Sequence, residues 1–177
     1  MVIRDWSSDV CSSDLRAMQA GLARILAGGT PVVADVEMIC VGLSRPRLAH
    51  FGITTHQFIS DPDVIDAARR DDTTRAVQAM RKAHRLGLLE GAIVGIGNAP
   101  TALIELVRLI RDEACRPALV IGMPVGFVSA AESKALLMAQ GEVPWVAIHG
   151  RKGGSTLVVA ALHALLGLAE AHQHGTA

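Results

Sequence analysis

The residues best suited to chemistry follow the ends of four predicted strands. Each of these segments combines glycine with polar or charged side chains. Glycine lets backbone N–H groups approach a ligand closely, and the N-terminus of a following helix favours negative charge. An anion-binding rim is therefore predicted from four segments: Asp35-Val-Glu-Met38, Gly95-Ile-Gly-Asn-Ala-Pro-Thr101, Gly122-Met-Pro-Val-Gly-Phe127 and His149-Gly-Arg-Lys-Gly-Gly-Ser155.

Basic side chains add explicit positive charge to this rim. Arg151 and Lys152 lie in the last segment, and Arg45, Arg47 and Arg75 are further candidates. Each feature also has a plainer interpretation, because many glycine turns bind nothing and Arg45 and Arg47 lie in a predicted polar turn where charges are solvated. The second segment lacks the lysine of a P-loop and the third glycine of a dinucleotide fingerprint. The prediction therefore depends on several loops meeting at one edge of a sheet.

The seven histidines show neither the spacing of a metal site nor that of a Ser-His-Asp or Cys-His arrangement. His149 is the best placed, because it ends a predicted strand beside the basic loop. The other six have plainer interpretations. His84 is a charge at a helix end and His163 is a core residue. His50 and His56 flank a predicted strand, and His172 and His174 lie in the tail. We predict no metal ligands.

Composition narrows the class of protein. The 177 residues are half hydrophobic and their formal net charge is zero, so nucleic acid is not an expected partner. Leu157–Ala169 is too short for a membrane span, and Met1–Leu15 is too polar for a signal peptide. Three cysteines without pairing or metal spacing suggest reduced thiols. We expect a soluble cytoplasmic protein with no membrane contact.

Strands and helices alternate along the chain, which predicts a single α/β domain with a mainly parallel sheet and helices on both faces. The expected strands are 31–36, 52–60, 92–97, 118–123 and 143–149. The expected helices are 16–27, a long helix that follows 71–74 and ends at 85, 101–111, 130–139 with Ser129 as its N-cap, and 155–168. Asp61-Pro62-Asp63 is predicted to be a turn. In such a sheet, ligands bind beyond the carboxyl ends of the strands, where the four segments lie.

The first fifteen residues differ from the rest. They contain the near-repeat SSDVCSSDL and no hydrophobic periodicity, and they resemble a translated cloning adapter more than a native terminus. A disordered native segment is the alternative. We therefore expect three parts: a non-native segment 1–15, an N-terminally truncated α/β domain 16–170, and a polar tail 171–177.

Four motifs carry a family resemblance from Ala17 to about Leu168. In order they are VVADVEMICVGLSR, VGIGNAPTAL, IGMPVGFVSAAESK and GRKGGST. In this order and spacing they resemble the precorrin-8X methylmutases and the related cobalt-precorrin-8 enzymes. The resemblance implies a homodimeric isomerase that moves a methyl group from C-11 to C-12 of a corrinoid without a cofactor. It also implies substrate-binding positions: Ser44, Arg45, Thr74, Arg75, Asn98, Thr101, Arg151 and Ser155.

The same resemblance implies a histidine that protonates the macrocycle as general acid, from a region upstream of Arg16. None of the seven histidines matches that position, so we expect impaired activity in this chain and name no catalytic residue. The alternative function is a non-catalytic binding protein for an acidic tetrapyrrole or a phosphorylated ligand. An unrelated enzyme on the same scaffold is a third possibility, which the order of the motifs disfavours.

Overall fold

The computed structural model describes residues 11–13 and 15–175. Within them the chain forms six strands and eight helices. The strands are β1 (Cys11–Ser13), β2 (Pro31–Ala34), β3 (Thr54–His56), β4 (Ile93–Ile96), β5 (Leu119–Gly122) and β6 (Trp145–Ile148). The helices are α1 (Leu15–Ala27), α2 (Glu37–Gly42), α3 (Arg45–His50), α4 (Pro62–Arg70), α5 (Arg75–Arg85), α6 (Pro100–Asp112), α7 (Ala130–Ala139) and α8 (Ser155–Gln173).

The strands form one sheet in the order β1-β6-β5-β4-β2-β3. The five strands from β2 to β6 run parallel, while β1 pairs antiparallel with β6 at the edge. The predicted α/β fold with a mainly parallel sheet is confirmed. The chain passes from β2 outward to β3 and then returns to β4 on the other side of β2. The carboxyl ends of β2 and β4 therefore form the topological switch point, where such sheets bind ligands.

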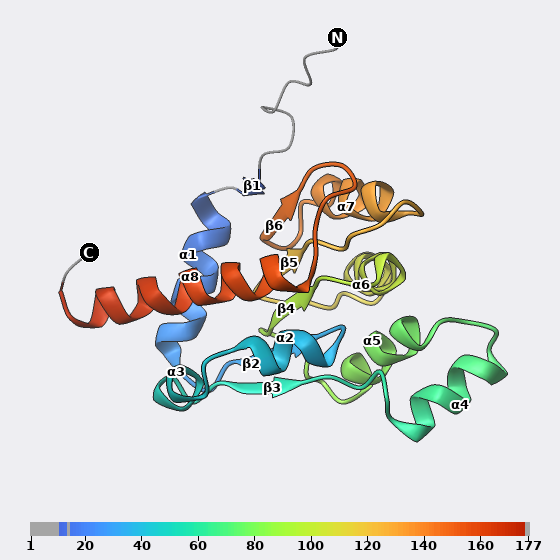
Figure 1. Ribbon diagram of the computed structural model, residues 1–177, viewed down its shortest axis with the longest axis horizontal. Helices are drawn as coiled ribbons and strands as arrows, with labels where there is room; N and C mark the ends of the chain where they lie inside the picture. Colours follow the sequence, from blue (N-terminus) through green and yellow to red (C-terminus); the bar gives the residue numbers. More distant parts are fainter. Residues whose placement is uncertain (1–10, 14, 176–177) are drawn as a thin grey trace, which may run out of the picture.

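Helices cover both faces of the sheet, as predicted (Figure 1). One hydrophobic cluster packs α1, α2 and α8 against one face, and a second packs α5, α6 and α7 against the other. Because both faces are covered, the central strands are apolar along their whole length: β4 and β5 are buried at every residue. Helix α8 is long and apolar enough to cross a membrane by length and composition. Here, however, its inner face packs on the sheet through Val158, Leu162 and Leu165.

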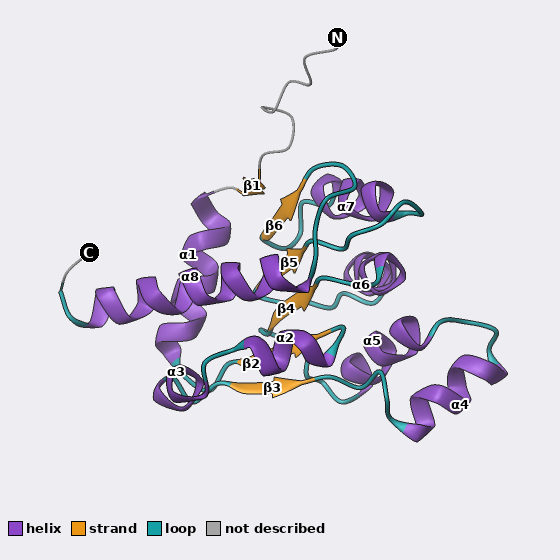
Figure 2. Ribbon diagram, viewed as in Figure 1, coloured by secondary structure: helices purple, strands orange, loops and turns teal. Residues whose placement is uncertain are grey.

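Three segments fold differently from the sequence prediction. Only Thr54–His56 of the expected strand 52–60 joins the sheet. The expected turn at Asp61–Asp63 is instead the start of α4, with Pro62 in its first turn, and the expected polar turn around Arg45 is helix α3 (Figure 2). In both short helices a proline in the first turn, where its missing N–H is not needed, marks the beginning of the helix rather than a loop. Helix α4 is stabilised by Val64, Ala67 and Ala68, which are buried.

The ends of two helices also differ. Ser129 occupies the predicted N-cap position of α7, but its φ is 59° and its side chain makes no capping hydrogen bond, so only the expected capping contact is wrong. A left-handed residue points its hydroxyl away from the first-turn N–H groups that an extended N-cap residue would reach. Helix α8 continues to Gln173, into the segment predicted as a tail. Hydrogen bonding of His50 Nε2 to Gln173 Oε1 at 2.7 Å holds that last turn.

The first fifteen residues are described only at 11–13 and 15. Strand β1 adds Cys11–Ser13 to the edge of the sheet beside β6. Residues 1–10 and 14 lie outside the described part of the chain. That the segment is non-native therefore stays a prediction.

Candidate functional site

The switch point is organised by a buried carboxylate. Asp35 follows β2 and is 1% exposed. Its Oδ1 accepts a hydrogen bond from Gly97 N at 3.0 Å, and its Oδ2 accepts from Asn98 N at 2.8 Å and from Ala99 N at 2.7 Å. Burial raises the pKa of this carboxyl above its usual 3.8, although the three backbone N–H groups act in the opposite direction. Asp35 therefore fixes the β4–α6 loop from inside the protein.

This contact changes the meaning of the glycine loop at Gly95–Thr101. The sequence suggests that its backbone amides face a ligand, but three of them bind the chain's own carboxylate. An anion such as a phosphate cannot use those same N–H groups while Asp35 holds them. The loop contributes side chains to the site, and the phosphorylated-ligand interpretation loses its strongest support.

Two glycines bring neighbouring loops into backbone contact. A Cβ atom at Gly97 would lie 2.5 Å from Cα of Ser155, and one at Gly153 would run into the carbonyl oxygen of Met123. Gly154 N also donates to Met123 O at 2.8 Å, and Met123 N donates to Ile96 O at 2.8 Å. The loops that follow β4, β5 and β6 therefore interlock through main-chain atoms beneath the rim.

Five of the predicted substrate-binding residues come together at this carboxyl edge. Thr74 caps α5 by accepting from Val77 N at 3.2 Å, and its Oγ1 lies 3.0 Å from Thr101 Oγ1 in the first turn of α6. Asn98 is exposed just before that helix, and Arg75 is exposed at the first position of α5. Ser155 begins α8 beside Gly97 and is buried. These residues come from three different helix starts.

Arg151 joins the same edge together with apolar side chains. Its guanidinium carbon lies 5.9 Å from the centre of the Phe127 ring, and its backbone oxygen accepts from Gly126 N at 3.3 Å. Phe127 is 86% exposed and Val128 is 82% exposed. Such exposure of apolar side chains next to a cation typically marks a binding surface. The β5–α7 loop thus presents an apolar surface beside a positive charge.

Lys134 is a residue of this site that sequence reasoning missed. It lies in α7 with a relative exposure of 0%, and its Nζ donates to the carbonyl oxygen of Lys152 at 2.6 Å. Burial lowers the pKa of this ammonium below its usual 10.5. Because lysine is seldom fully buried, its residue type does not indicate such a role. The only sequence feature that could have identified it is its position at the end of the motif IGMPVGFVSAAESK. Its contact positions the basic β6–α8 loop that carries Arg151.

Ser44 and Arg45 lie away from the other predicted residues. Arg47 Nη2, two residues beyond Arg45, pairs with Glu170 Oε2 at 3.0 Å near the C-terminal end of α8. Glu170 follows Ser155 by about 22 Å along the helix axis, at 1.5 Å per residue. Within one chain, Ser44 and Arg45 therefore flank the middle and far half of α8 rather than the strand ends.

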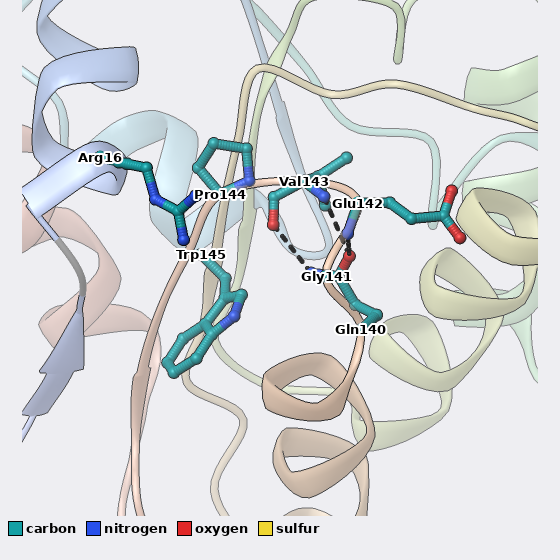
Figure 3. Close-up of a pocket in the computed structure, with 7 residues that line it drawn as sticks. All are labelled: Arg16, Gln140, Gly141, Glu142, Val143, Pro144 and Trp145. Atoms are coloured by element: carbon teal, nitrogen blue, oxygen red, sulfur yellow. Dashed lines mark hydrogen bonds between the residues drawn. The ribbon is translucent and has the colours of Figure 1, made fainter.

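A separate hollow lies beside the loop that leads into β6, at the amino end of that strand; Figure 3 shows the residues that line it. It is lined by Arg16 and by the loop Gln140–Trp145. The Gln140 side chain closes that loop: its Oε1 accepts from Glu142 N and Val143 N, and its Nε2 donates to Val143 O at 2.9 Å. The polar groups of Gln140 are thus used within the loop, and the Glu142 carboxylate pairs with Arg116. These contacts give the hollow a structural explanation, and it is not the candidate site.

Comparison with known proteins gives one consistent result. The family model described as precorrin-8X methylmutase matches residues 5–168. Cobalt-precorrin-8 methylmutase of Leptospira interrogans is 48% identical over 156 residues, covering 85% of this chain and 70% of that protein. Cobalt-precorrin-8 methylmutase of Priestia megaterium is 51% identical over 154 residues, covering 87% and 67%. The crystal structure of precorrin-8X methylmutase from Thermus thermophilus superposes with a TM-score of 0.82 at 48% identity, covering 90% and 76%.

Proposed function

The chain belongs to the precorrin-8X methylmutase family of isomerases in cobalamin biosynthesis, and we propose that it moves a methyl group from C-11 to C-12 of the macrocycle. With precorrin-8X the product is hydrogenobyrinic acid, and with cobalt-precorrin-8 it is the cobalt-containing equivalent. A methyl group changes its ring carbon and no electrons enter or leave the molecule. The reaction therefore needs no redox cofactor.

The observation that carries the proposal is the pairing of charge and apolar surface at the carboxyl edge. A precorrin has many carboxylates around a large apolar ring system. Arg151 beside the exposed Phe127 offers a cation next to an aromatic surface. Arg75, Asn98 and the Thr74–Thr101 pair add polar groups from neighbouring helix starts. We infer that the ring lies against the apolar loop and that its carboxylates meet the surrounding basic and hydroxyl groups.

The chemical step needs a proton donor. Protonation of the conjugated ring withdraws electrons from the carbon that receives the methyl group, which lowers the barrier to migration. The family resemblance implies a histidine donor upstream of Arg16. Of the seven histidines, which are all described, His149 lies exposed at the end of β6 beside the basic loop. Replacement of His149 therefore tests whether a histidine of the described part of the chain serves as the proton donor.

The decisive experiment incubates the purified chain with precorrin-8X or cobalt-precorrin-8 and follows the change in absorbance as product forms. Product formation supports the isomerase, and a rate equal to that of the homologous enzymes would refute reduced turnover. Binding without any product would support the non-catalytic alternative. The two substrates are run in parallel, because the relatives described above include enzymes named for each.

A binding measurement tests the placement of the carboxylate contacts. We expect Arg75→Ala and Arg151→Ala each to weaken hydrogenobyrinic acid binding by about tenfold, as expected for loss of one charge-assisted contact. Arg85→Ala is the matched control, since Arg85 is exposed at the last position of α5, at the opposite end of the helix that Arg75 begins. An unchanged affinity in Arg75→Ala would show that the carboxylate contact at that position is wrongly assigned.

We also propose that two copies of the chain pair through α2 and α8. Met38 and Val41 of α2 are 59% and 68% exposed, and Leu157 and Leu168 of α8 are 40% and 45% exposed. Apolar side chains exposed on two neighbouring helices favour burial against a partner. Light scattering is expected to give twice the chain mass of 18.6 kDa. Val41→Glu is expected to give the monomer mass, and a monomer in the unsubstituted chain would contradict the pairing.

A further inference from the structure

Three side chains that commonly bind metals meet at the amino edge of the sheet, opposite the candidate site. His84 comes from the last turn of α5, Glu90 from the α5–β4 loop and Cys115 from the α6–β5 loop. One ligand atom from each lies within 4.8 Å of the others. Their separations along the chain do not match a zinc-binding motif, which is why the sequence predicted no metal ligands. The fold, not the local sequence, creates this cluster.

We propose that His84, Glu90 and Cys115 form a binding site for one Zn²⁺ ion. Imidazole nitrogen, thiolate sulfur and carboxylate oxygen are the protein ligands that zinc prefers. Zinc–ligand distances of about 2.0 to 2.3 Å place tetrahedral ligands roughly 3.5 Å apart. The three atoms therefore need to approach one another by only about 1 Å. A water molecule completes the fourth position.

Two further contacts hold the ligands as metal sites usually require. Glu113 Oε2 lies 3.0 Å from Nε2 of His84. A metal-binding histidine normally donates its second ring N–H to such a carboxylate, which makes Nδ1 the coordinating nitrogen in this arrangement. Arg116 N donates to both carboxylate oxygens of Glu90, at 3.2 and 3.3 Å, and so orients it.

The guanidinium of Arg116 does not occupy the cluster. Arg116 directs its Nη1 to the carbonyl oxygens of Ile110 and Cys115, at 2.8 and 2.9 Å. Its backbone, rather than its guanidinium, is what binds Glu90. The depression that opens beside the cluster and reaches the imidazole is lined by Arg81, His84, Arg85, Arg108, Leu109 and Glu113. Two of its three arginines are paired with carboxylates, Arg81 with Glu105 and Arg108 with Glu105 and Glu113.

Proton release is a necessary part of binding. Zinc binds cysteine as the thiolate, so the Cys115 thiol must lose its proton when the ion binds. Zinc forms a bond to sulfur as the S–H bond breaks, and the proton passes to solvent. Affinity for zinc is therefore expected to rise with pH. Because the cluster joins the loops that precede β4 and β5, the ion would stabilise the fold rather than act on the substrate.

The test uses the whole chain, stripped of metal with a chelator. Zinc is titrated against a chromophoric chelator, and Co²⁺ is titrated separately to look for the thiolate-to-cobalt charge-transfer band. We expect one equivalent to bind, the thiolate band to appear, and the thermal midpoint to rise in excess zinc. Cys115→Ser should lose the band and weaken zinc binding by tenfold or more. Cys40→Ser is the matched control, because its thiol is free and lies elsewhere, on α2.

His84→Gln gives a second route if Cys115→Ser fails to fold, and it should also weaken zinc binding by tenfold or more. Binding that lacks the cobalt–thiolate band, or that is equally strong in wild type and His84→Gln, would overturn the proposal. So would binding that disappears when His172 and His174 are replaced, since the ion would then be held by the C-terminal histidines. The absence of any binding at micromolar zinc would have the same effect.

Discussion

Replacing Asp35 by alanine should destabilise the β4–α6 loop on which the candidate site is built. The change removes the acceptor for three backbone N–H groups, at Gly97, Asn98 and Ala99. Gly97 is buried, so its N–H would be left without a partner, while the groups at Asn98 and Ala99 lie closer to solvent. An unsatisfied buried donor costs about 1 to 3 kcal/mol, and lost hydrogen bonds to a charged group cost about as much again. We therefore expect the free energy of unfolding to fall by about 3 kcal/mol.

The asparagine variant separates the hydrogen bonds from the charge. Asp35→Asn keeps one oxygen acceptor and removes the cost of burying a charge, but it turns an NH2 group toward one of the donors. Its loss should be smaller than that of alanine. The assay is urea unfolding followed by circular dichroism, with Asp66→Ala as control, because Asp66 is 75% exposed. The control should stay within about 0.5 kcal/mol of the unsubstituted chain.

The pH dependence has a defined sign. Burial raises the pKa of Asp35, so the folded chain holds this proton to a higher pH than the unfolded chain does. Its contribution to the free energy of unfolding is fully present below 3.8 and is lost as pH rises through the folded-state pKa. That decline should be missing in Asp35→Asn. A loss below 1 kcal/mol in Asp35→Ala would refute the view that this carboxylate supports the loop.

Two other substitutions test buried charges. In the unsubstituted chain the free energy of unfolding should rise between the lowered folded-state pKa of Lys134 and pH 10.5, because the folded chain releases this proton first. Lys134→Met should abolish that rise. Urea titrations at several alkaline pH values measure the rise, and an unchanged pH slope in the variant would contradict the prediction. Glu105→Gln should cost about 1 to 2 kcal/mol at neutral pH, because Arg81 Nε and Arg108 Nη2 donate to Glu105 Oε1 at 2.8 and 2.6 Å. Burial alone would raise the pKa of Glu105, but these arginines bring it below 4.5. The difference in stability between Glu105→Gln and the unsubstituted chain should therefore persist above pH 4.5 and vanish as the pH falls through the lowered pKa. Calorimetry in acid checks this, and a difference in stability that is independent of pH would count against the ion pairs.

The architecture was predictable from the sequence because its strands have an unusual pattern. In β4, Val94 and Ile96 pack into the hydrophobic cluster on one face of the sheet and Ile93 packs into the cluster on the other face. No position in this strand is therefore polar. Such a run is typical of a parallel strand covered on both faces. The short helices α3 and α4 were harder to predict, because six to nine residues with a proline near the start also fit a turn.

The site was predictable only in part. Motif resemblance located Thr74 and Thr101, which the structure joins by a hydrogen bond. The inward role of Asp35 could not be predicted, because a carboxylate at a strand end looks the same in sequence whether it faces a ligand or the protein. Lys134 was missed because buried lysines are rare. The cluster of His84 and Cys115 was missed because β4 and α6 separate the two residues along the chain.

The backbone contacts at Gly97 and Gly153 have a consequence for how a substrate is accommodated. Since three loops touch through main-chain atoms, the floor of the site is stiff, and none of them can swing aside alone. Little conformational entropy then remains to be lost there when a ligand binds. Adaptation to a macrocycle with or without a central cobalt would thus fall to the outer side chains, which can be exchanged without reshaping the platform beneath them.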